Sequence, residues 1–173
     1  TKGGAVYNST SFSLIGIGTF IDSLYAIKKT VFEDRKYTLE HLKEMIKADF
    51  QGFEADRQYL MNKLPKYGQP DAGVDKLAKQ VFHDLAKHSS GMPNPRGGYY
   101  EASLFAFFFY DVVKENTWAT PDGRHAGQRI SRGCNPGETS ENIDAATLMN
   151  SLRSIDMAEY PGCGVTYLEM PVS

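Results

Sequence analysis

The chain has 173 residues, 41% of them hydrophobic and 12% aromatic, which is enough for one domain with a sizeable core or for a large piece of a bigger one. Its formal net charge of −2 gives no electrostatic basis for binding nucleic acid or an anionic membrane surface. The sequence has no apolar run long enough to span a bilayer and no signal-peptide pattern. Its two cysteines, Cys134 and Cys163, form neither a disulfide framework nor a metal-ligand spacing, so we expect free thiols in a reducing cytoplasm.

The first residues, Thr1-Lys2-Gly3-Gly4, lack an initiating methionine. We expect an excised or processed segment, although a trimmed start would have the same appearance. Residues 3–8 predict a flexible entry, followed by a Ser/Thr-rich turn through Ser13.

The first helix is predicted over residues 16–33, because six apolar side chains recur there at helical spacing: Ile17, Phe20, Ile21, Leu24, Ile27 and Val31. Gly16 and Gly18 lie in its first turn. Glycines there can cradle an anion on free N–H groups, but close packing against a neighbouring element is favoured. Asp22 with Lys29, and Glu33 with Lys29 or Lys36, are interpreted as ordinary ion pairs on the helix surface.

Three further helices are predicted in the first half of the chain. Thr38 is expected to cap the first of them, which runs to about Phe50, and the second extends from about Phe53 to Leu64, before Pro65. Asp71 is the expected N-cap of the third, whose apolar row extends from Val74 to Ala86 and is the clearest amphipathic pattern in the chain. His83 and His88 on this helix are five residues apart, which is the wrong spacing for two metal ligands on one face, so we interpret both as solvated.

The second half of the chain alternates loops with short elements. Residues 99–110 are rich in aromatics, and after Glu101 the side chains on both faces of an extended segment would be apolar. This pattern indicates a long strand covered on both faces. A buried helix is the alternative. A short helix is predicted over 144–155 and a final strand over about 163–170. Several helices with about two long, well-separated strands indicate a slice of an α/β layer structure.

The segment from Thr120 to Gly127, Thr-Pro-Asp-Gly-Arg-His-Ala-Gly, predicts a rigid turn. Pro121 fixes φ, Asp122 can bond to nearby backbone N–H groups, and Gly123 accepts a positive φ. Arg124 therefore leaves a well-defined turn with five donors in a planar fork. It is either an exposed arginine on a surface turn or a side chain presented to a carboxylate, a phosphate or another backbone segment.

Basic side chains gather between residues 96 and 132: Arg96, Arg124, His125, Arg129 and Arg132. They are interpreted either as a patch that holds an anionic ligand or as partners of acidic neighbours. The thiol of Cys134 lies close to Arg132 in sequence, which could lower its pKa, although a structural loop cysteine is favoured. We assign no catalytic residue and no metal ligand from these patterns.

Several separated motifs resemble the glycyl radical enzymes, a family that includes pyruvate formate-lyase, glycerol and diol dehydratases, and radical decarboxylases. They are Gly3-Gly4-Ala5-x-Tyr7-Asn8, Gly16-x-Gly18, the run from Asp22 to Phe32, the 120–127 turn, Gly133-x-Asn135-Pro136, and Leu148-x-Asn150-Ser151 with Asp156. The resemblance covers nearly the whole chain in the right order. Gln128-Arg129 stand where the family usually has Glu-Pro.

This resemblance implies a segment of a ten-stranded α/β barrel, helix-rich, from the C-terminal half of the barrel. It also implies a parent enzyme, either a formate acetyltransferase-like transferase or a dehydratase or other lyase. That parent would be anaerobic and cytoplasmic, homodimeric, and activated by a radical S-adenosylmethionine enzyme that installs a glycyl radical. Thr120, Asp122, Gly123 and Arg124 would brace the substrate or the radical loops.

The family's radical cysteine belongs before residue 3 and its radical glycine after residue 173, so residues 1–173 are expected to be one segment that lacks both catalytic loops. Neither Cys134 nor Cys163 stands at the family's radical position. We therefore expect a scaffold segment that is inert alone. The alternative is a stand-alone interaction module that holds an anion on Arg96, Arg129 and Arg132.

Overall fold

A computed structural model describes residues 4–105, 107–139 and 144–168 of the chain. In chain order its elements are β1 (Thr10–Ser13), α1 (Ile17–Ile27), the π-helix η1 (Lys28–Glu33), α2 (Leu39–Lys47), α3 (Glu54–Asn62), α4 (Ala72–Ser89), β2 (Tyr100–Ser103), α5 (Phe109–Val112), the 3-10 helix η2 (Val113–Asn116), α6 (Ala145–Leu152) and the 3-10 helix η3 (Met157–Glu159). None of the helices in these ranges combines the length and the apolar character needed to cross a bilayer.

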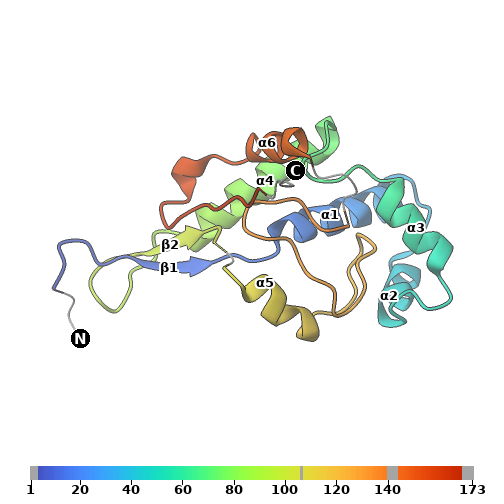
Figure 1. The fold of residues 1–173 in the computed structure, drawn as a ribbon, viewed down its shortest axis with the longest axis horizontal. Coiled ribbons are helices and arrows are strands. Elements are labelled where there is room, and N and C mark those ends of the chain that lie inside the picture. The colour runs from blue at the N-terminus through green and yellow to red at the C-terminus, as the bar shows by residue number, and fades with distance from the viewer. Residues whose placement is uncertain (1–3, 106, 140–143, 169–173) are drawn as a thin grey trace, which may run out of the picture.

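Helices α1 and α4 lie in the middle of the molecule beside the short β1–β2 pair (Figure 1). The two strands are parallel, with Thr10 opposite Tyr100 and Ser13 opposite Ser103. The larger core lies between these elements, with Ile21, Val74, Ala78 and Leu104 fully buried. Helix α4 forms as the sequence predicts, because Asp71 Oδ1 accepts hydrogen bonds from the N–H groups of Gly73 (2.9 Å) and Val74 (3.0 Å) and the apolar row faces this core.

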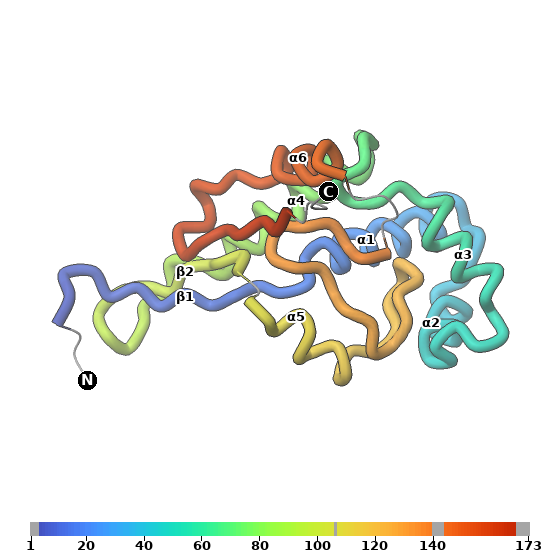
Figure 2. The backbone as a smooth tube through the Cα atoms, in the orientation of Figure 1, coloured from blue at the N-terminus to red at the C-terminus, as the bar shows by residue number. Residues whose placement is uncertain are grey.

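A second, smaller core lies at the opposite end of the molecule from the strands, where α2 and α3 pack together (Figure 2). Leu42, Met45, Phe50 and Leu60 are its fully buried side chains. Thr38 caps α2, as predicted, by accepting a hydrogen bond from the His41 N–H at 3.1 Å. The two cores are joined through α1, whose residue Ala26 belongs to the smaller one.

The helix-rich α/β organisation with two strands is confirmed, but the strand positions differ from the prediction. Of residues 99–110, only Tyr100–Ser103 form a strand; the chain leaves the sheet after the Leu104 bridge and begins α5 at Phe109. Both strands are four residues long. The partner strand, β1, lies in the segment predicted to be a Ser/Thr-rich turn. In place of a final strand at 163–170, the described part through 168 has a single bridge between Gly164 and Leu104, and 169–170 lie outside the described residues.

Helix α1 confirms one prediction about its first turn and contradicts another about its surface. A Cβ at Gly18 would lie 2.5 Å from the Asn135 carbonyl oxygen, so this glycine serves close packing against the 131–137 segment. Asp22, predicted to pair with Lys29 on the surface, is instead 2% exposed and lies in the interior. Lys29 pairs with Glu33 (3.4 Å) and Asp34 (3.0 Å).

Candidate functional site

The turn from Thr120 to Gly127 is closed by its own backbone. The Gly123 N–H donates to the Thr120 carbonyl oxygen (3.0 Å), and the Thr120 N–H donates to the Arg124 carbonyl oxygen (3.0 Å). Gly123 has φ +96, and a Cβ there would meet Met61 of α3 at 2.5 Å. A glycine is required at this position by both the backbone conformation and the contact with α3. The rigid turn predicted from the sequence is therefore present.

Asp122 is fully buried and holds the turn against three other segments. Its carboxylate accepts hydrogen bonds from the hydroxyl groups of Thr120 (2.5 Å), Thr139 (2.9 Å) and Ser23 of α1 (3.4 Å). Its backbone carbonyl oxygen accepts from the ammonium group of Lys66 (2.9 Å). Asp122 therefore joins α1, the loop after α3 and the 131–139 segment.

Arg124 is 1% exposed, and its fork is directed at the loop that carries it. Nη1 donates to the carbonyl oxygens of His125 (2.9 Å) and Gln128 (2.6 Å), Nη2 donates to the Trp118 carbonyl oxygen, and Nε donates to the Thr120 hydroxyl oxygen (3.2 Å). Of the possibilities that the sequence left open, the structure selects a backbone segment as the partner of Arg124. Its guanidinium stabilises the 118–128 loop from inside.

The outer side of the turn is fastened by residues that the sequence analysis did not single out. Asp49, just after α2, accepts hydrogen bonds from the Ala126 N–H (2.8 Å) and approaches His125 Nδ1 (3.1 Å). Arg57 of α3 donates from Nε to the Gly123 carbonyl oxygen (3.0 Å). Both contacts span more than sixty residues of sequence, so no local pattern could have revealed them.

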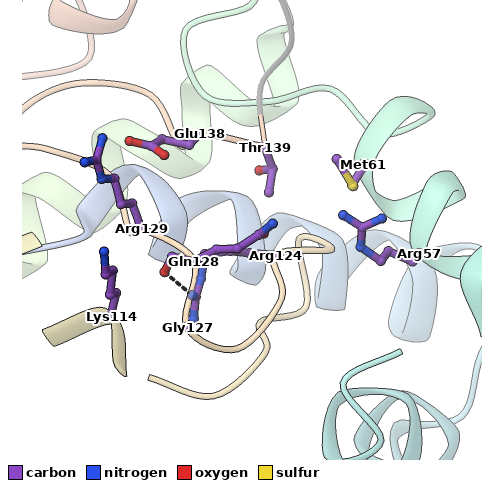
Figure 3. A pocket seen from close by; sticks show the side chains of 9 residues that line it. All are labelled: Arg57, Met61, Lys114, Arg124, Gly127, Gln128, Arg129, Glu138 and Thr139. Carbon is purple, nitrogen blue, oxygen red and sulfur yellow. Dashed lines mark hydrogen bonds between the residues drawn. The ribbon is translucent and has the colours of Figure 1, made fainter. Parts of the chain in front are cut away.

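A cavity of about 350 Å³ lies between α3 and this turn, and four of its nine lining residues are cationic. Figure 3 shows Arg57 on one side, Lys114 and Arg129 on the other, and Arg124 between them; Glu138 is the one acidic residue in the lining. Lys114 and Arg129 share Asp111, at 2.8 and 2.9 Å, and Arg57 pairs with Glu54 at 2.8 Å. The cations at this cavity are therefore already engaged with carboxylates or carbonyl oxygens.

Of the three arginines predicted to form an anion patch, Arg129 and Arg132 lie at the same tyrosine ring, whereas Arg96 lies elsewhere. Arg129 and Arg132 both approach the ring of Tyr110, at 6.0 and 5.4 Å from its centre, and Arg132 also lies over Tyr167. Arg96 instead donates to the Ser9 carbonyl oxygen and the Thr10 hydroxyl at the start of β1, both at 3.2 Å. It lies at the far end of the strands from Arg132, because the 131–137 segment adjoins Leu104 at the other end of β2.

The structure favours the structural interpretation of Cys134. Its side chain is 1% exposed, and burial raises the pKa of its thiol to about 11, so it is a poor nucleophile near neutral pH. His83 and His88 are exposed, as predicted; His83 Nδ1 lies 2.6 Å from the Glu159 carboxylate. Across the described ranges, no three His, Cys, Asp or Glu residues are grouped as a metal site would require.

Residues 1–113 match the family model described as pyruvate formate lyase-like. Trans-4-hydroxy-L-proline dehydratase from Clostridioides difficile is 31% identical over 155 residues, which is 90% of this chain and 20% of that protein. The crystal structure of hydroxyproline dehydratase from that organism, with trans-4-hydroxy-L-proline bound, aligns with a TM-score of 0.87 over 92% of this chain and 20% of that one, at 30% identity.

Two other solved structures are similar. The glycerol-bound form of the B12-independent glycerol dehydratase from Clostridium butyricum has a TM-score of 0.85 and 31% identity, with 94% of this chain and 21% of that chain covered. A glycyl radical enzyme from Archaeoglobus fulgidus has a TM-score of 0.77 and 27% identity, with 88% and 20% covered. The chain thus spans about a fifth of the length of the relatives it matches.

Proposed function

Because this chain belongs to the pyruvate formate-lyase-like family of glycyl radical enzymes, we propose that it forms part of the barrel wall of such an enzyme. The observation that carries the proposal is the alignment with hydroxyproline dehydratase, at a TM-score of 0.87, over 92% of this chain but only 20% of the dehydratase. The parent would act on a small organic substrate by thiyl-radical hydrogen abstraction. The dehydratases among the relatives favour lyase chemistry over acetyl transfer.

In this proposal the segment is a scaffold and is inert alone. The hydrogen bonds of Asp122 and Arg124 support that role, because both side chains bind other residues of the segment. A rigid wall that excludes water protects a radical from side reactions. The radical cysteine and glycine, the activating radical S-adenosylmethionine enzyme and the homodimeric assembly all belong to the proposed parent.

The full open reading frame that contains these 173 residues tests this proposal. We expect it to encode a cysteine-containing loop upstream of residue 3 and an Arg-x-x-Gly-Tyr-like segment downstream of residue 173. The purified 173-residue chain, incubated without oxygen with an activating enzyme of a related dehydratase, should show no glycyl radical signal in electron paramagnetic resonance. Turnover of glycerol or trans-4-hydroxy-L-proline by the isolated chain would contradict the scaffold role.

The cavity favours a second candidate function, a stand-alone module that binds an anion, which would displace Asp111 from Lys114 and Arg129. Arg129 is the suitable residue to test, because its side chain is half-exposed and its substitution leaves the buried turn intact. Titration with inorganic phosphate should then give saturable heat with the unaltered chain and weaker binding with Arg129→Gln. Arg96→Gln is the matched control, since Arg96 lies far from the cavity. Absence of saturable binding would exclude this candidate.

A further inference from the structure

Three ionisable side chains lie in the interior where α1, the loop after α3 and the 120–127 turn converge. They are Asp22, Lys66 and Asp122, each no more than 2% exposed. Buried carboxyl and ammonium groups are costly unless each charge is balanced and hydrogen-bonded. The cluster holds two carboxyl groups and one ammonium group.

Lys66 and Asp122 are both well satisfied. Lys66 Nζ donates to the carbonyl oxygens of Leu60 and Asp122, both at 2.9 Å. The Asp122 carboxylate accepts hydrogen bonds from three hydroxyl groups, which is the environment of an ionised carboxylate. Both carboxylate oxygens of Asp122 therefore have hydrogen-bond donors, and Lys66 is the one ammonium group beside two carboxyl groups.

Asp22 is different, because only one of its carboxyl oxygens has a partner. Oδ1 accepts a hydrogen bond from the Tyr67 N–H at 2.7 Å, whereas Oδ2 is buried without any hydrogen bond within the described ranges. Oδ2 lies against Gly137, where an added Cβ would be 3.1 Å from it. An oxygen without a hydrogen-bond partner is costly in the interior in either state, but a buried carboxylate also carries an unbalanced charge, which costs far more than a neutral acid at the same place.

The surroundings of Asp22 do not offer a second cation. Burial raises the pKa of its carboxyl to about 7; Lys66 opposes this, the charge of Asp122 adds to it, and the Tyr67 N–H opposes it. Tyr67 is neutral, with its hydroxyl donating to the Ser151 carbonyl oxygen at 2.9 Å. Arg124 is engaged with the carbonyl oxygens of its own loop, and Glu138 of the 131–139 segment is exposed.

We infer that Asp22 is held in the folded chain as a neutral carboxylic acid with its proton on Oδ2, and that this proton lets α1, the Lys66 loop and the 120–127 turn close together. Loss of the proton to solvent leaves two carboxylates and one ammonium group in the interior, shielded from bulk solvent. The site is a property of this segment and goes beyond the scaffold role, since it makes the docking of the turn sensitive to pH near neutrality.

The sign of the pH dependence follows from the folded-state pKa. Because it lies above the unfolded value of 3.8, the folded chain keeps a proton that the unfolded chain has released. Stability therefore falls as pH rises from about 4 to 7 and stays low above that range. A shift of this size corresponds to a change in the unfolding equilibrium constant of up to about a thousandfold.

Urea unfolding of the purified chain between about pH 5 and pH 8 tests the inference. Asp22→Asn, which resembles the neutral acid but cannot ionise, should lose the decline in stability and exceed the unaltered chain above about pH 7. Asp111→Asn is the matched control, since Asp111 is an exposed ion-pair partner, and it should keep the decline. Equal pH profiles for Asp22→Asn and the unaltered chain would overturn the inference.

A second measurement does not depend on the variant folding. Infrared spectroscopy of the unaltered chain at about pH 6, where ordinary carboxyl groups are ionised, should show the carbonyl stretch of one protonated acid that disappears as pH is raised above 8. Absence of that band at about pH 6 would overturn the inference, whatever the behaviour of Asp22→Asn.

Discussion

A single guanidinium group holds the 118–128 loop in its shape. Three backbone carbonyl oxygens and one hydroxyl oxygen accept hydrogen bonds from Arg124, which is itself 1% exposed. The planar fork reaches acceptors in several directions at once, which the single nitrogen of a lysine does not. The identity of the residue therefore matters more than its charge.

Replacement of Arg124 by lysine should destabilise the chain by about 1–3 kcal/mol, because at least two partly buried carbonyl groups would lose their donors. Urea unfolding followed by far-UV circular dichroism measures the effect. Arg129→Lys is the control, because Arg129 forms an exposed pair with Asp111 and should change the free energy of unfolding by less than about 1 kcal/mol. Equal effects of the two substitutions would show that the fork geometry of Arg124 is unimportant.

The sequence predicted this turn but not the partner of its arginine. Pro121, Asp122 and Gly123 act on their own neighbours, so their residue types suffice to indicate the backbone shape. Asp22 was placed wrongly for the opposite reason. Its neighbours on α1 give ordinary helical spacing, and only the approach of Tyr67 and Asp122 from distant parts of the chain buries it.

The same contrast holds for helices and strands. The caps at Thr38 and Asp71 were predicted, because each side chain accepts hydrogen bonds from N–H groups two or three residues ahead; Asp144 caps α6 by the same local bond. The strand predicted over 99–110 was too long, because a continuous apolar run does not show where pairing with the neighbouring strand ends. Strand β1 was missed since its four residues, Thr-Ser-Phe-Ser, have little apolar character and depend on pairing with β2.

For the secondary-structure elements, the testable prediction concerns the N-cap of helix α4. Replacement of Asp71 by alanine should lower the free energy of unfolding by about 1 kcal/mol, because the N–H groups of Gly73 and Val74 lose their acceptor. Asp71→Asn retains a cap oxygen and should remain close to the unaltered chain. Thermal unfolding of the three proteins measures the difference, and an equal loss with asparagine would indicate that charge, rather than the cap bond, stabilises this helix.

At the scale of the whole molecule, the chain presents an aromatic surface formed by Phe105, Phe107, Phe108 and Phe109. Their exposed fractions are 37–56%, and consecutive rings lie 4.8–5.8 Å apart. Contiguous exposed apolar surfaces of this kind mark interaction sites in soluble proteins. The β1–β2 pair also lacks neighbouring strands in the described part of the chain, and two short parallel strands are not independently stable. Both features agree with the proposal that this chain is a segment of a larger barrel, in which other elements cover the aromatic surface and extend the sheet.

The isolated chain should therefore associate with itself through the aromatic surface. We expect sedimentation velocity to show a weight-average mass that rises with protein concentration, and the Phe107→Ser/Phe109→Ser double variant to sediment as a monomer because apolar burial drives the association. Phe32→Ser is the control, since Phe32 is 66% exposed on η1 and outside the aromatic surface. A monomeric unaltered chain, or an equal effect of Phe32→Ser, would show that these four rings do not form the contact surface.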